Sequence, residues 1–123
     1  MGNRANINVK GAGSSVFLYT HGDGERLPYI LRDALKKKER WDDSQYLASG
    51  IFREMIKDDV IEDDMDQFTG FGISSKCFDG SENVIVVDAD NQTVSWDNKA
   101  CKFLQFTVFS NSKIKDLFRK SKT

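Results

Sequence analysis

Residues 16–35 read VFLYTHGDGERLPYILRDAL and contain the signals of a strand, a turn and a helix in succession. The run from Val16 to Thr20 is apolar, aromatic and β-branched, which is typical of a strand. It ends at His21, and the Gly-Asp-Gly sequence at 22–24 predicts a turn. The apolar side chains then recur with the i, i+3, i+4, i+7, i+8 spacing of a helix that buries one face: Leu27, Ile30, Leu31, Ala34 and Leu35. The stretch therefore predicts a strand and a helix joined by a loop that carries the only histidine of the chain.

Length and composition predict one globular domain over residues 1–123, with a tail at 111–123 that is helical or frayed. The net charge of −1 argues against a nucleic-acid-binding protein, which normally carries a basic excess. The residues after Met1 lack the apolar segment of a secretion signal, and no apolar run reaches the ~18 residues of a membrane span. We therefore expect a cytoplasmic protein with no membrane partner. Two cysteines, Cys77 and Cys101, are too few for a disulfide scaffold, and reduced thiols are favoured over a pair.

Working outward, Asn6 to Lys10 alternates polar and apolar residues and predicts a hairpin with the strand at 16–20. A second helix is expected after Trp41-Asp42-Asp43-Ser44, where Asp42, Asp43 or Ser44 can cap it. Its apolar stripe is Leu47, Ala48, Ile51, Phe52 and Met55. The fold class predicted is α+β: a mostly antiparallel sheet with an N-terminal hairpin, two central helices packed on it, and a β-rich C-terminal half with a short terminal helix.

In that second half, Phe68 to Ser75 predicts a strand whose two glycines indicate a bulge or a close backbone approach. The continuous apolar run Val84 to Val87 predicts a central strand covered on both faces. Ala100 to Leu104 predicts another strand, and residues 106–110 either extend that strand or start a short helix. The terminal helix is expected at Ile114 to Phe118, and the acidic run from Asp58 to Asp66 is expected to be a solvated loop or a frayed helix end.

Seven segments, spread in order over roughly residues 5–97, resemble a group of small uncharacterised bacterial and phage proteins. They are FLYTH (17–21), Leu27 to Leu35, RWDD (40–43), YLA (46–48), IFREMIK (51–57), TGFGIS (69–74), and VVD with QTV (86–88 and 92–94). The resemblance implies a compact accessory protein encoded by a phage or prophage. That group has a tryptophan directly after its Thr-His pair, where this chain has Gly22, so no role of that tryptophan is carried over.

The residues that suit a ligand site are aromatic or positively charged and lie near glycine turns or a helix start, where backbone N–H groups and partial positive charge favour anions. They are Tyr19, His21, Arg26, Trp41 and Arg53. Each also has a structural interpretation, and Trp41 in particular fits an aromatic staple at a helix start. No metal site or cofactor is predicted, because one histidine, two separated cysteines and no phosphate-loop or dinucleotide motif provide none of the known ligand patterns.

Three functions compete on this evidence. The leading one is a non-enzymatic binding protein, in its sharper form a phage counter-defence protein that sequesters an anionic nucleotide-derived ligand. The second is a protein–protein inhibitor of a host factor that uses the acidic run, with Asp63, Asp64 and Asp66 as partner-binding residues. The third is a small hydrolase in which His21 acts with Cys77 or a hydroxyl group. The acidic run and the basic tail also make a dipolar surface, which would suit a homo-oligomer.

Overall fold

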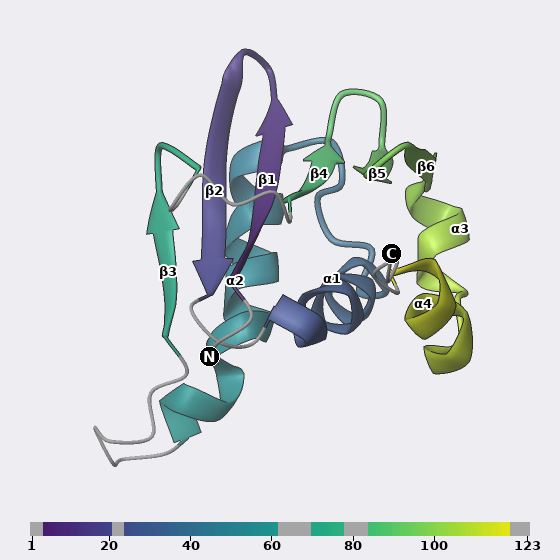
Figure 1. The fold of residues 1–123 in the computed structure, drawn as a ribbon. Helices are drawn as coiled ribbons and strands as arrows, with labels where there is room; N and C mark the ends of the chain where they lie inside the picture. Colours follow the sequence, from purple (N-terminus) through teal and green to yellow (C-terminus); the bar gives the residue numbers. More distant parts are fainter. Residues whose placement is uncertain (1–3, 21–23, 62–69, 78–83, 119–123) are drawn as a thin grey trace.

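The computed structural model describes residues 4–20, 24–61, 70–77 and 84–118, and for 58–61 it describes the backbone alone. Within these ranges the chain forms a six-stranded sheet, four α-helices and one 3-10 turn (Figure 1). The strands are β1 (Ala5–Gly11), β2 (Ser14–Thr20), β3 (Phe71–Ser74), β4 (Val84–Asp88), β5 (Thr93–Trp96) and β6 (Lys99–Lys102). The helices are η1 (Gly24–Arg26), α1 (Leu27–Leu35), α2 (Ser44–Ile61), α3 (Phe103–Thr107) and α4 (Asn111–Leu117). The predicted α+β class is confirmed.

The predicted N-terminal hairpin supplies the second and third strands of the sheet. Ala12 and Gly13 join its strands, both with positive φ (52° and 80°), as a two-residue type I′ turn requires. The strand order is β3-β2-β1-β4-β5-β6, and all neighbours are antiparallel except β1 and β4, which are parallel. Among the described strands, β3 and β6 are therefore the edges.

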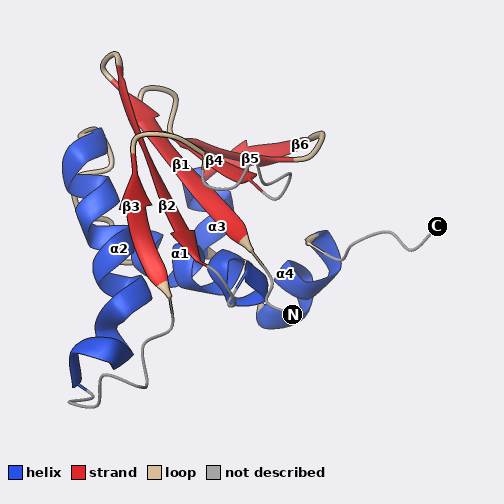
Figure 2. Ribbon diagram, turned by 60° about the vertical axis from the view of Figure 1, so that its left-hand side comes forward, coloured by secondary structure: helices blue, strands red, loops and turns tan. Residues whose placement is uncertain are grey.

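The helices α1 and α2 lie on one face of this sheet (Figures 1 and 2). Because strand side chains alternate between faces, every second residue of β1, β2, β4 and β5 enters the core beneath those helices. The core combines these strand residues with the apolar stripes of the helices: Ile7, Val9, Leu18, Val87, Val94, Leu31, Leu35, Ile51, Phe103 and Phe106. Both predicted central helices are present, and Asp43 caps α2, because its Oδ1 accepts hydrogen bonds from the N–H groups of Gln45 (3.1 Å) and Tyr46 (3.2 Å).

The expectation that Val84–Val87 is covered on both faces is wrong. Ile85 and Val87 are buried, whereas Val84 and Val86 on the opposite face are only half-buried. The strand is central in the sheet, but among the described helices none lies on that second face (Figure 2). A continuous apolar run therefore does not by itself indicate two covered faces.

The strand expected at Ala100–Leu104 ends two residues early, and α3 begins at Phe103. Phe103, Phe106 and Thr107 are buried while Leu104 is 59% exposed, which is a helical spacing of buried positions. Two aromatic side chains, Phe103 and Phe106, thus reach the core from a short helix. The terminal helix α4 confirms the prediction for that segment, and Ser110 caps it by accepting from the Lys113 N–H (3.1 Å).

Two further expectations lie partly outside the described residues. The strand predicted from Phe68 begins at Phe71, directly after Gly70, whose φ is +79°. The backbone of residues 58–61 belongs to α2, and the rest of the acidic run, with Asp63, Asp64 and Asp66, is not among the described residues.

Candidate functional site: an apolar groove beside helix α2

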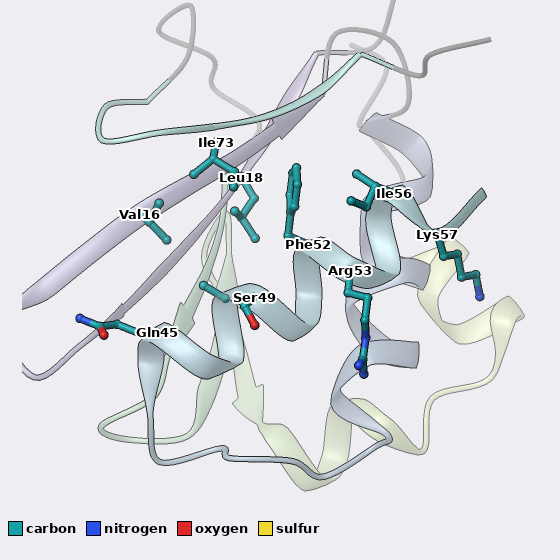
Figure 3. A pocket seen from close by; sticks show the side chains of 10 residues that line it. Val16, Leu18, Gln45, Ser49, Phe52, Arg53, Ile56, Lys57 and Ile73 are labelled. Atoms are coloured by element: carbon teal, nitrogen blue, oxygen red, sulfur yellow. The ribbon is translucent and has the colours of Figure 1, made fainter. Parts of the chain in front are cut away.

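A groove of about 620 Å³ lies between α2 and the strands β2 and β3; we call it the α2–β3 groove (Figure 3). Its lining is almost entirely apolar on the inside. Val16 and Leu18 come from β2, Ile73 comes from β3, and the rest come from α2: Gln45, Ala48, Ser49, Phe52, Arg53, Ile56 and Lys57. The strand register explains why β2 and β3 both line the groove. Leu18 on β2 pairs with Ile73 on β3, and both side chains point to the face of the sheet that α2 covers.

Helix α2 presents apolar residues on two faces rather than one. Leu47, Ile51 and Met55 are buried in the core with at most 4% exposure. Phe52 and Ile56 follow those positions by one residue each, so they lie about 100° further round the helix and line the groove. Both are half-buried. In Figure 3 the Phe52 ring points from α2 toward the strands.

At the sheet edge, Ile73 has 56% of its surface exposed on the groove side. The strand that carries it, Phe71-Gly72-Ile73-Ser74, has no charged residue and no proline, which are the usual means by which edge strands avoid contact with other chains. Of the bulge or close backbone approach predicted at the two glycines, the structure shows a close approach at Gly72, by a side chain rather than by a backbone. A Cβ atom on Gly72 would overlap the ring of Tyr19, its register partner on β2.

The rim of the groove on α2 is polar. Gln45, Ser49, Arg53 and Lys57 follow one another at i, i+4, i+8 and i+12, which is one row along the helix surface. Figure 3 shows the Arg53 and Lys57 side chains pointing away from the strands. Arg53 lies 3.5 Å from the Glu39 carboxylate, and Lys57 lies 2.7 Å from that of Glu54.

Glu54 is the one acidic side chain among the buried described residues. It is 6% exposed, and it pairs with Lys37 (3.1 Å) as well as with Lys57. Burial raises the pKa of Glu54, but the hydrogen bonds and charges of Lys57 and Lys37 outweigh it, so this pKa is below its usual range. The carboxylate is therefore ionised at neutral pH and joins α2 to the chain that follows α1.

A second hollow, of about 480 Å³, lies on the other side of Arg53. It contains more polar surface, from Lys37, Glu39 and Arg40, and Tyr46 at its edge is 58% exposed. The Arg40 guanidinium carbon lies 4.2 Å from the centre of the Tyr46 ring. Each described cation here has a carboxylate within ion-pair distance, since Arg40 faces Asp43 (3.4 Å) in addition to the pairs above.

The four predicted ligand residues that the structure describes do not line a common cavity. Trp41 is a packing residue: its ring meets Phe103 edge-on at 5.3 Å, and its Nε1 donates to the Leu35 carbonyl oxygen (3.2 Å). Tyr19 projects from the sheet face opposite to Leu18 and the groove. Arg26 is exposed at the end of η1, and only Arg53 borders either hollow. His21 lies outside the described residues.

The sequence interpretation missed the groove because it assigned Leu47, Ala48, Ile51, Phe52 and Met55 to one stripe. A signal was present: with Ile56 added, the apolar positions span more of the helix circumference than a single buried face needs. The sequence does not show where β3 lies beside α2, because that position depends on the order of the strands in the sheet.

Within the described ranges, no group of three or more His, Cys, Asp or Glu side chains is placed to hold a metal ion. Cys77 and Cys101 do not form a disulfide. No helix in the described part of the chain has the length and apolar character needed to span a membrane. Comparisons of the chain with protein-family models, with curated proteins and with solved structures find no match.

Proposed function

We propose that this chain is a non-enzymatic binding protein that holds a segment of a partner protein in the α2–β3 groove. The observation that carries the proposal is the exposed apolar lining, with Ile73 more than half exposed beside Phe52 and Ile56. An apolar groove of this kind, bordered by polar residues, is typical of an interaction surface. The sequence resemblance to small uncharacterised bacterial and phage proteins supports a host protein as the partner, as in the inhibitor hypothesis, but with the groove in place of the acidic run.

The same observation makes an anionic nucleotide-derived ligand less suitable for this groove. Such a ligand needs charged and polar groups aimed at it, whereas Arg53 and Lys57 point away from the groove interior. Among the described residues, the second hollow suits an anion with a flat ring better, because the Arg40 guanidinium and the exposed Tyr46 ring lie beside it. The anionic-ligand hypothesis thus stays a prediction, and a thermal-shift screen against nucleotides, repeated with Tyr46→Ala, tests it.

The proposal is tested with a yeast-displayed library of random peptides of roughly 16 residues, long enough as a helix to cover the groove at about 1.5 Å per residue. Peptides are selected on the wild-type protein and then compared on Ile73→Lys. We expect binding to be lost on this variant, since a charge is placed in the apolar lining. Its free energy of unfolding should change by less than about 0.5 kcal/mol, because the side chain is already largely exposed.

The matched control is Leu104→Lys on α3. Leu104 is 59% exposed, nearly the same as Ile73, and it lies outside the groove. Selected peptides should bind this variant as they bind the wild type. A selection that yields no binders, or binders that tolerate Ile73→Lys but not Leu104→Lys, would contradict the proposed function.

A further inference from the structure

No further inference is drawn: the strongest candidate, the polar hollow of about 480 Å³ between α2 and the chain that follows α1, carries nothing, because each described cation that lines it already pairs with a carboxylate of this chain.

Discussion

At the residue scale, the pairing of Gly72 with Tyr19 explains why a glycine lies in the interior of an edge strand. Glycine normally weakens a strand, since it has no side chain to pack and loses more backbone freedom on folding. Here the absent Cβ leaves room for the Tyr19 ring on the face opposite to the groove. The local cost of the glycine is therefore offset by an aromatic contact across β2 and β3.

Gly72→Ala should lower the free energy of unfolding by about 1–3 kcal/mol, because the new methyl group forces the Tyr19 ring out of its place. Gly50→Ala on α2 is the matched control. A Cβ there meets no atom within 4 Å, so alanine should stabilise the helix by about 0.5–1 kcal/mol. Urea unfolding of both variants measures the difference, and equal effects at the two positions would contradict this account.

At the scale of elements, α2 performs two roles with two neighbouring stripes. Leu47, Ile51 and Met55 attach it to the core, while Phe52 and Ile56 form the wall of the groove. Glu54 holds the same helix laterally through Lys37 and Lys57. Phe52 and Ile56 also pack in part against the core, so the groove face of α2 is anchored as well as exposed.

The ionised state of Glu54 predicts a dependence of stability on pH. The pKa of Glu54 is lower in the folded chain than in the unfolded chain, so the ionised form favours folding. This contribution is complete above about pH 4.3, the ordinary value for glutamate, and is lost as the pH falls through the lower folded pKa. The wild type should lose more stability than Glu54→Gln between about pH 5 and pH 3.

Urea midpoints measured at several pH values for the two proteins provide that comparison. At neutral pH, Glu54→Gln should be the less stable protein, since it leaves Lys37 and Lys57 without the carboxylate between them. The other carboxylates titrate in both proteins, and the difference between the two curves isolates Glu54. Parallel curves over the whole range would contradict the role assigned here.

Helices and strands were predictable from the sequence wherever their apolar residues recurred with a regular spacing that matched a single buried face. The helix at 27–35 and the hairpin at 6–20 are of this kind, and both are confirmed. The prediction failed where local pattern and tertiary position differ. Val84–Val87 has the composition of a fully covered strand but a half-buried second face, and Phe103 enters the core from a helix rather than from a strand.

At the scale of the whole molecule, the sheet and its helices are offset. Strands continue beyond α2 to β3, whereas the described helices do not. That offset creates the groove, and it depends on the order β3-β2-β1, which pairs a strand from residue 71 onward with the hairpin. Local sequence patterns do not determine strand order, so the candidate site was not predictable from them. Of the predicted ligand residues that the structure describes, only Arg53 borders it.

The central claim is that the α2–β3 groove receives a segment of a partner protein, and the most direct measurement is NMR of the methyl-labelled protein with the tightest selected peptide. The account predicts intermolecular NOEs from the peptide to the methyl groups of Val16, Leu18, Ile56 and Ile73. NOEs to Leu104 and Val108, the exposed apolar side chains at α3, with none to Ile73, would contradict it.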